Sequence, residues 1–165
     1  MLQLIPFEEK DFPTILGWVE SPRFLMQWGG PMFSFPLTHQ QLMDYKNTQD
    51  RRTFQVYDPS VEKIIGHISI GRIDEDKKQA RIGKVLVSPV HRGKGYGKQM
   101  IQLISTYAFQ HLELEKVTLG VFDFNKSAIR CYENAGFTKD RYLKNHRPFE
   151  DEYWSLYEMS LHKYT

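Results

Sequence analysis

The residues with the most chemical information form a turn that contains three alternate glycines. Gly93, Gly95 and Gly97 follow the apolar run 85–87 and stand where a segment with helical periodicity begins. Glycine allows successive backbone N–H groups to point inward without a side-chain clash. The first N–H groups of a helix also lack partners within the helix and lie at the positive end of its dipole. We therefore expect this turn to bind a phosphate or a diphosphate.

The charge around the turn also favours an anionic ligand. Residues 77–98 contain seven lysines and arginines and no aspartate or glutamate, whereas the whole chain has 22 basic and 20 acidic residues and a net charge of +2. A balance so close to neutral does not by itself predict a nucleic-acid-binding protein. The basic segment would suit such a protein, but the glycine spacing has no role in it. Nucleic acid is therefore the lowest-ranked ligand, and the expectation is that none is bound.

Two common phosphate-binding loops do not match the turn. A Walker A loop requires a glycine where the chain has Arg92, and a serine or threonine where it has Gln99. A Rossmann fingerprint that starts at Gly93 requires its third glycine where the chain has Lys98. The nucleotide-binding folds that use these loops are therefore not indicated.

The pattern that matches is Arg92-x-x-Gly95-x-Gly97 after an apolar strand and Pro89. A second motif follows the next predicted strand. Its members are Asn125, Ala128, Tyr132, Gly136 and Phe137. Together the two motifs resemble those of the GNAT superfamily of acyl-CoA-dependent N-acetyltransferases. The order of elements agrees over nearly the whole chain, and the motifs themselves lie within residues 64–137.

This resemblance implies that acetyl-CoA lies between the strands at 80–87 and 117–122, which splay apart. Backbone groups of the first strand would pair with the pantetheine and the thioester carbonyl, and one N–H would stabilise the developing oxyanion. The glycine turn would hold the diphosphate, and Asn125 would contact the pantetheine or fix its loop. The cofactor-binding residues implied are Val85, Leu86, Val87, Arg92, Gly93, Lys94, Gly95, Tyr96, Gly97, Lys98 and Asn125. No metal is implied.

The resemblance also implies a reaction in which the acceptor amine attacks the thioester directly, in a ternary complex. Tyr132 would be the general acid, because a phenol with a pKa of about 10 is protonated at neutral pH and can donate a proton to the departing thiolate. The alternative is that Tyr132 only packs a helix against the sheet. Cys131 is expected in the core rather than as a nucleophile.

The sequence offers no obvious general base. Many members of the family have a glutamate five residues before the asparagine, where this chain has Gly120. Ordered water, Glu152 or His67 are the alternatives, and Asp123 is expected to brace the turn before Asn125. The missing glutamate also motivates an alternative function, a non-catalytic acyl-CoA-binding regulatory module.

The acceptor remains open between a small amine, such as a polyamine or an aminoglycoside, and a peptide amine such as a protein N-terminus. In the family it arrives over the first helices and the last hairpin. Cation–π contacts or simple core packing are both expected roles for the aromatic residues there. These are Trp18, Trp28, Phe33, Phe35, Tyr142, Tyr153 and Trp154. Acidic residues could attract a cation or only solvate a loop; they are Asp140, Glu150, Asp151 and Glu152.

Alternating and helical apolar patterns predict the elements that position these residues. Strands are expected at residues 2–5, 52–57, 64–73, 80–87, 117–122, 137–143 and 153–161. Helices are expected at residues 11–19, 38–45, 97–112 and 126–135, with Asp11, Thr38 and Asn125 as N-caps and Gly136 after the last. Ser21-Pro22 is expected to break the first helix, and residues 28–31 and 146–148 are expected to be loops.

The pattern predicts a mixed α/β fold of the GNAT type, with about seven mostly antiparallel strands and about four flanking helices. A length of 165 residues and a mass of 19.5 kDa favour a single domain over residues 1–165. One cysteine and the absence of a signal peptide or a long apolar segment indicate a cytoplasmic protein that does not enter a membrane. The sequence does not determine the oligomeric state; a homodimer, the commonest assembly, is one possibility.

Overall fold

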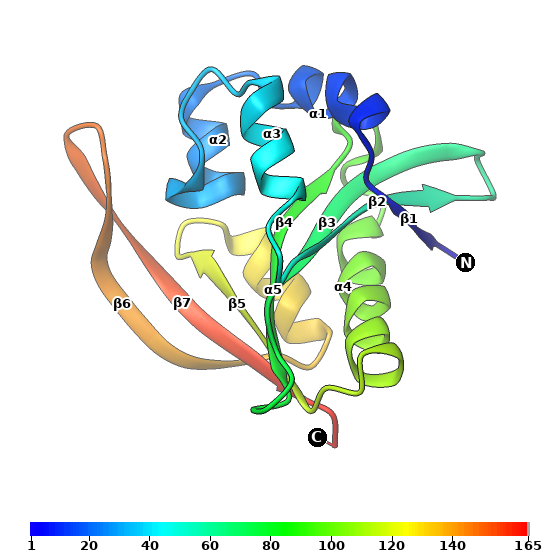
Figure 1. Cartoon of the computed structure of the whole chain (residues 1–165). Coiled ribbons are helices and arrows are strands. Elements are labelled where there is room, and N and C mark those ends of the chain that lie inside the picture. Colours follow the sequence, from blue (N-terminus) through cyan, green and yellow to red (C-terminus); the bar gives the residue numbers. More distant parts are fainter. Residues whose placement is uncertain (165) are drawn as a thin grey trace.

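Seven strands form one mixed sheet in the computed structural model, which describes residues 1–164 (Figure 1). The strands are β1 (Gln3–Pro6), β2 (Arg52–Asp58), β3 (Lys63–Asp74), β4 (Gln79–Val87), β5 (Lys116–Phe122), β6 (Thr138–Phe149) and β7 (Glu152–His162). Their order across the sheet is β1-β2-β3-β4-β5-β7-β6. Only β4 and β5 run parallel, and every other neighbouring pair is antiparallel. The predicted sheet is confirmed.

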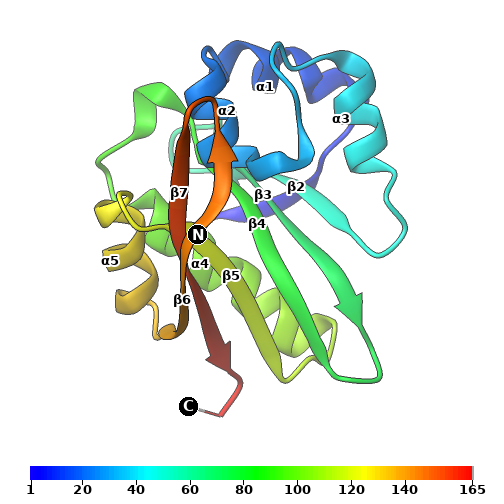
Figure 2. The ribbon, with the colours of Figure 1, turned by 90° about the vertical axis from the view of Figure 1, so that its left-hand side faces the viewer.

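Five α-helices flank the sheet. They are α1 (Phe12–Trp18), α2 (Pro22–Gly29), α3 (His39–Lys46), α4 (Tyr96–Thr106) and α5 (Lys126–Asn134). Figures 1 and 2 show α1, α2 and α3 gathered at the top of the molecule, with α4 and α5 lower along the sheet. Short 3-10 turns cover Glu9–Asp11, Gly30–Met32 and Pro89–His91, and a π-helical turn over Tyr107–His111 extends α4.

Two apolar clusters hold these layers together. The larger packs α4 and α5 against the sheet and includes Met100, Ile104 and Ile129. The second packs α1, α2 and α3 together and reaches the sheet at Leu86 of β4. Because alternate residues of a strand face opposite sides, β4 contributes to both clusters. Strand β4 is therefore packed on both of its faces.

Helix α2 was not predicted, which accounts for the difference between four expected helices and five. The first helix ends at Trp18, three residues before Ser21, and Ser21-Pro22 begins the next helix. The Ser21 hydroxyl accepts a hydrogen bond from the Phe24 N–H at 3.1 Å, and proline is favourable in the first turn. The helix ends at Gly29, and Gly30, which follows it, has a φ of +62°. Residues 28–29, predicted as loop, thus belong to α2.

The last hairpin also differs from the prediction. Strand β6 runs through residues 146–148, which were expected to be a loop, and the turn comes at Glu150 and Asp151. Asn145 has a φ of +49°, and the register of β6 against β7 shifts between Leu143 and Arg147. Pro148 is tolerated because β6 is the edge strand of the sheet. The polar segment is therefore a bulge within a long edge strand.

Only one of the three predicted N-cap side chains caps its helix. The Thr38 hydroxyl accepts a hydrogen bond from the Gln41 N–H at 3.2 Å, as expected. The Asp11 side chain instead accepts one from the Glu8 N–H at 2.9 Å, before the helix. The Asn125 side chain makes no capping bond to α5. Residue type at a helix start predicted the boundaries but not every side-chain contact.

The splay between β4 and β5 is confirmed. The two strands pair only where residues 79–81 of β4 lie beside residues 116–118 of β5. From Ile82 onward, β4 has no paired strand on the side of β5. A bulge at Lys84, where φ is +53°, locally breaks the pairing of β4 with β3. Bulges bend a strand and increase its twist. The splay therefore leaves a gap between the two strands beyond Arg81 and Thr118.

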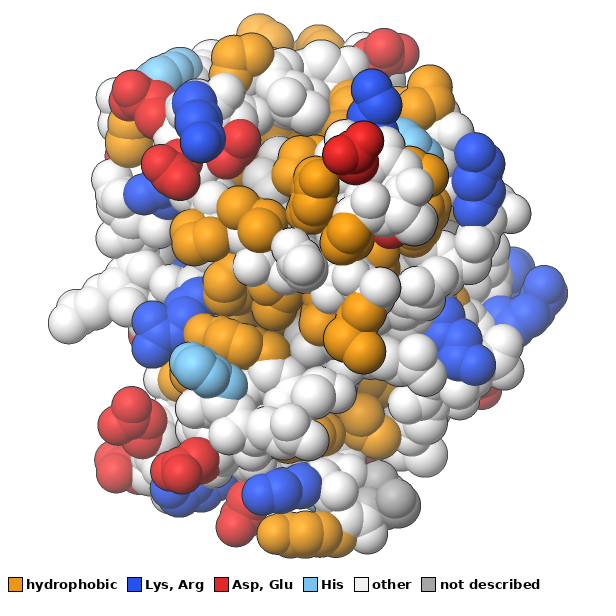
Figure 3. Space-filling model, turned by 90° about the vertical axis from the view of Figure 1, so that its right-hand side faces the viewer, with side chains coloured by type: hydrophobic (Ala, Val, Ile, Leu, Met, Phe, Trp, Pro, Cys, Tyr) orange, Lys and Arg blue, Asp and Glu red, His pale blue; other side chains and the backbone are white. Residues whose placement is uncertain are grey.

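The face that carries the β1 edge of the sheet and α4 is shown in Figure 3. Hydrophobic side chains gather across its middle, with charged side chains mostly around them. Ile5 on β1 and Val61 in the β2–β3 turn are 37% and 45% exposed. No helix within residues 1–164 has the length and apolar character needed to cross a membrane.

Candidate active site

The glycine turn has the backbone geometry expected of an anion site. Gly93 and Gly95 have φ values of +77° and +82°, a region that side chains other than glycine rarely adopt. No atom lies within 4 Å of the position that a Cβ would occupy at either residue. The N–H groups of Gly93, Lys94 and Gly95 donate to no other described residue. The turn is therefore open, and its amides are available to a diphosphate.

Two side chains hold the ends of this turn. The Arg92 Nε donates to the Val87 carbonyl at 3.2 Å, and its guanidinium lies 5.1 Å from the centre of the Phe24 ring. The Tyr96 hydroxyl donates to Asp58 of β2 at 2.6 Å. This bond holds the pKa of the Asp58 carboxyl below its usual range and raises the pKa of Tyr96. The start of α4 is thereby tied to the sheet.

A first cavity of about 380 Å³ opens beside the turn. It is lined by the end of β4, the turn itself, α2 and α5. Every residue predicted to bind the cofactor lines it except Lys94 and Lys98, which are exposed on the outer side. Residues of its lining that the sequence analysis did not assign to the cofactor are Phe24, Gln27, Trp28, His91, Ser127 and Ala128. The first three belong to α2, so recognising Ser21-Pro22 as a helix start would have pointed to them.

A second cavity of about 490 Å³ lies on the other side of the splay, between α2, β4, β5 and the last hairpin. The two cavities share Gln27, Trp28, Val85, Asn125 and Tyr132. They therefore meet at the point where the strands separate. A molecule in one cavity can approach a molecule in the other at this junction.

Tyr132 stands at the junction and is 9% exposed. Burial raises the pKa of its hydroxyl above the usual value, so the phenol is protonated throughout the neutral range. None of the side-chain hydrogen bonds among residues 1–164 involves this hydroxyl. Its proton is available to a ligand in either cavity. Packing and proton donation are both compatible with this position.

The two side chains considered as bases lie away from the junction. His67 is fully buried, its Nδ1–H donates to Gln55 at 2.9 Å, and its Nε2 accepts from the Tyr45 hydroxyl at 2.8 Å. Burial lowers the pKa of His67 to about 3, so the ring is neutral. Glu152 accepts hydrogen bonds from Arg23 and from the Trp154 ring, at the hairpin end. Neither lines the first or the second cavity.

Two nearby groups have local partners instead. Asp123 accepts a hydrogen bond from the Tyr142 hydroxyl at 2.8 Å, which agrees with a bracing role beside the turn before Asn125. Cys131 lines the first cavity, and a Cβ at Gly97 would lie 3.4 Å from its sulfur. Burial raises the pKa of the Cys131 thiol. A thiol with a raised pKa is a poor nucleophile at neutral pH.

Of the aromatic residues proposed for the acceptor side, only Trp28 lines the second cavity. Trp154 is buried in a small cluster with Met26, Phe122 and Leu156, which joins α2 to β5 and β7. The aromatics that lie elsewhere are Trp18, Phe33, Phe35, Tyr142, Tyr153 and Trp154. An aromatic cage for the acceptor is therefore not formed, and core packing explains Trp154.

Comparison with known proteins agrees with this geometry. Residues 19–137 match the model of the acetyltransferase (GNAT) family. An N-acetyltransferase 9-like protein of Nematostella vectensis is 24% identical over 146 residues, which cover 82% of this chain and 74% of the relative. The spermidine N(1)-acetyltransferase of Vibrio cholerae is 30% identical over 92 residues, which cover 56% of this chain and 52% of the relative.

The fold is also that of solved structures. A crystal structure of spermidine N-acetyltransferase from Vibrio cholerae in complex with CoA and spermine superimposes with a TM-score of 0.85 at 23% identity, covering 98% of this chain and 95% of the other. Because the family model covers most of the chain and the splayed sheet agrees with it, the protein belongs to the GNAT family of N-acetyltransferases, which take their acetyl group from acetyl-CoA.

Proposed function

We propose that the protein transfers an acetyl group from acetyl-CoA in the first cavity to a primary amine in the second, by direct attack in a ternary complex. The observation that carries this proposal is that both cavities open onto Val85, Asn125 and Tyr132. Two substrates bound on opposite sides of the splay would meet there without a covalent enzyme intermediate. Holding two reactants in this way removes much of the entropic barrier to their reaction.

The chain supplies distinct groups for each part of the co-substrate. The N–H groups of Gly93, Lys94 and Gly95 suit the diphosphate, with Arg92 beside them. The unpaired edge of β4 at residues 85–87 suits the pantetheine amides. A backbone N–H of this edge would stabilise the negative charge that develops on the thioester oxygen. Lys94 and Lys98, which are exposed beside the turn, would add positive charge near the diphosphate.

The chemical step needs one nucleophile and one acid. The lone pair of the amine attacks the thioester carbon, the C–S bond breaks, and the Tyr132 hydroxyl gives its proton to the departing sulfur. The products are the N-acetylated amine and CoA. The proton that the attacking nitrogen loses passes to water in the second cavity, because Gly120 offers no side chain there and His67 and Glu152 lie elsewhere. Tyr132 then regains a proton from solvent.

The cellular setting is part of the same proposal. Cys131 is the only cysteine of the sequence and is a free thiol, which suits the reducing cytoplasm. The small amine acceptors of the related spermidine enzymes support a small amine rather than a large partner. A single domain over the whole chain stays a prediction, and a homodimer stays a possibility.

The proposal is tested by mixing the protein with acetyl-CoA and a panel of primary amines and measuring the release of free thiol. Thermal unfolding with CoA gives a second readout, since a ligand at 100 times its Kd adds about 2.7 kcal/mol of stability. We expect both a melting shift and thiol release. A melting shift without turnover on any amine would favour the regulatory module instead, and no shift with CoA would contradict both.

A further inference from the structure

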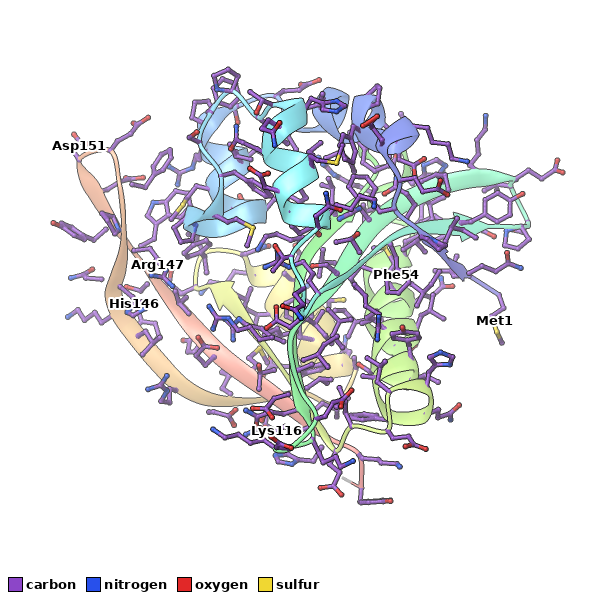
Figure 4. All side chains as sticks on the ribbon, in the orientation of Figure 1. Met1, Phe54, Lys116, His146, Arg147 and Asp151 are labelled. Carbon is purple, nitrogen blue, oxygen red and sulfur yellow. The ribbon has the colours of Figure 1, made fainter. Side chains whose placement is uncertain are left out.

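The second cavity has an unusual charge for a site that receives an amine. Four basic side chains and one acidic side chain line it, and they come from β3, β4, β6 and β7. These residues are Arg72, Arg81, Lys84, Arg147 and Glu158. Figure 4 shows Arg147 in the arm of the hairpin, some way below Asp151 at its tip. The wall that an acceptor would meet is therefore predominantly positive.

The single acid does not offset this charge, because it is already paired. Glu158 accepts two hydrogen bonds from the Arg81 guanidinium, at 2.8 and 3.2 Å. Arg72, Lys84 and Arg147 form no ion pair with any carboxylate among residues 1–164. Three cations thus line one cavity without an ion pair among residues 1–164. Arg72 also lines another cavity, whose acidic residues are Asp50, Asp74, Glu75 and Asp76, so Lys84 and Arg147 are the cations with the least compensation.

Lys84 is the most constrained of the three. It sits on the β4 bulge, it is largely buried, and Arg51, Arg72 and Arg81 lie close enough to repel its charge. Burial and these three guanidinium groups lower the pKa of Lys84 to about 8. His67 also interacts with Lys84, but its ring is neutral. Burying a charge without a partner is costly, and an anion in the cavity would remove that cost.

We propose that the second cavity selects a primary amine that also carries an anionic group, a carboxylate or a phosphate, which Arg72, Lys84 and Arg147 bind. This inference rests on the proposed function, because it names the class of acceptor for the same reaction. The anion would be held by the basic wall while the amine points to the junction at Tyr132. Arginine suits carboxylates and phosphates because its planar fork can donate two parallel hydrogen bonds.

The acceptor expected for this chain differs in charge from that of the relatives whose names specify spermidine. A polyamine carries several positive charges at neutral pH, and a cavity with three unpaired cations would repel it. Like-charge contacts of this kind are a common way for a site to reject a ligand. We therefore expect this protein to use a different acceptor from those relatives, although it shares their fold.

Matched pairs of amines test the inference directly. Glucosamine 6-phosphate is compared with glucosamine, and the dipeptide Gly-Gly with its C-terminal amide, with spermidine as the polycation. We expect kcat/KM to be at least about tenfold higher for the anionic member of a pair, which is ~1.4 kcal/mol, and lowest for spermidine. The two pairs also distinguish phosphate from carboxylate as the anion. Turnover with no preference, or with spermidine preferred, would overturn the inference and leave the transferase intact.

A variant shows whether the basic wall is responsible. Arg147→Gln should reduce kcat/KM for the anionic amine severalfold more than it reduces kcat/KM for the neutral partner, so that the preference falls. Lys144→Gln is the control, since it removes one charge from the same strand outside both cavities. An equal loss for both amines in Arg147→Gln would indicate a structural effect instead, and an equal effect of both variants would contradict a specific site.

A binding measurement keeps the inference testable if no amine is acetylated. Inorganic phosphate is titrated at pH 8 into protein saturated with CoA, which occupies the glycine turn, by calorimetry in two buffers of different ionisation enthalpy. An anion beside Lys84 raises its pKa, so phosphate binding should take up protons, and the uptake should disappear in Lys84→Met. Binding with proton uptake but no turnover would refute the proposed function alone. No phosphate binding would refute this inference.

Discussion

Arg81 of β4 reaches across β5 to Glu158 of β7, to which it donates hydrogen bonds at 2.8 and 3.2 Å. Glu158 lies directly opposite Gly120 in the antiparallel pairing of β5 and β7. A Cβ at Gly120 would lie 2.6 Å from the Arg81 Nη2. The glycine that stands where many relatives have glutamate is therefore the residue that leaves room for this ion pair.

The first prediction concerns the space that Gly120 leaves for the Arg81 side chain. Gly120→Ala should displace the Arg81 guanidinium rather than unfold the sheet, because the crowded atom is the end of a flexible side chain. The pair is partly exposed, so the expected loss is about 1 kcal/mol in urea unfolding. Glu158→Gln should cost little more when added to Gly120→Ala, because the pair is already broken.

Gly83→Ala is the matched control on β4, since its Cβ would make only an ordinary contact, 3.9 Å from the Ser69 hydroxyl. It should leave the Arg81–Glu158 pair intact. Fully additive losses from Gly120→Ala and Glu158→Gln would show that Gly120 does not shelter the pair.

The second prediction concerns Tyr132 as proton donor. Tyr132→Phe keeps the ring that packs against the sheet but removes the hydroxyl at the junction. We expect kcat to fall by about 10²- to 10⁴-fold with CoA affinity unchanged, as for the loss of a general acid. Tyr107→Phe, in the helical turn after α4, should change neither quantity. Unchanged turnover in Tyr132→Phe would leave this residue with a packing role only.

The third prediction concerns the glycine turn. Gly95→Ala places a side chain at a φ of +82°, where alanine is disfavoured by about 1–2 kcal/mol, although the space is open. The backbone should shift to relieve this strain and weaken CoA binding by about tenfold or more, which is ~1.4 kcal/mol. Calorimetric titration with CoA measures the effect.

Gly17→Ala provides the comparison for this turn. Gly17 lies in α1, has no positive φ and has no atom within 4 Å of its missing Cβ. Alanine there should stabilise the helix by about 0.5–1 kcal/mol without altering CoA binding. Similar CoA affinities in the two variants would argue against the turn as the diphosphate site.

The fourth prediction concerns His67 and acid stability. The ring is neutral in the folded protein because burial lowers its pKa to about 3, whereas an unfolded histidine has a pKa of about 6.5. Between these values the unfolded chain binds one more proton, so stability rises with pH by ~1.4 kcal/mol per unit. Stability from this group is therefore full above about pH 6.5 and is lost as the pH falls toward 3.

Replacement of the ring separates this effect from that of the carboxylates. His67→Gln should be less stable near neutral pH, because the hydrogen bonds to Tyr45 and Gln55 are disturbed. Its stability should also depend less on pH than that of the unaltered protein between pH 4 and 6, by close to one proton, as followed by urea unfolding across this range. Parallel pH curves for the two proteins would mean that His67 is not buried in the neutral form.

The fifth prediction concerns Cys131. Cys131→Ala should retain turnover within about a factor of two, because the raised pKa leaves little thiolate for an acyl-enzyme. The thiol still lines the first cavity, so acetyl-CoA, which has no free thiol of its own, should slow the alkylation of Cys131 by iodoacetamide. Loss of activity together with a burst of acetylated enzyme would contradict direct attack. Alkylation at the same rate with and without acetyl-CoA would place the co-substrate elsewhere.

The sequence by itself determined the parts of this protein that depend on short-range signals. Gly93 and Gly95 specified the turn because their backbone conformation is costly for other residues. Alternating apolar residues specified the strands, and the spacing from Asn125 to Gly136 specified α5 and its end. From these the family, the acetyl-CoA co-substrate and most of the lining of the first cavity followed.

Only the tertiary structure decided what depends on contacts between distant segments. Helix α2 places Trp28 at the junction of the two cavities. His67 is buried and forms hydrogen bonds with Tyr45 and Gln55 instead of water. Glu158 lies opposite Gly120 in the sheet. No local pattern encodes these contacts, because each arises from sheet order and helix packing over many residues. The charge of the second cavity has the same origin, since its cations come from three strands that meet only in the folded chain.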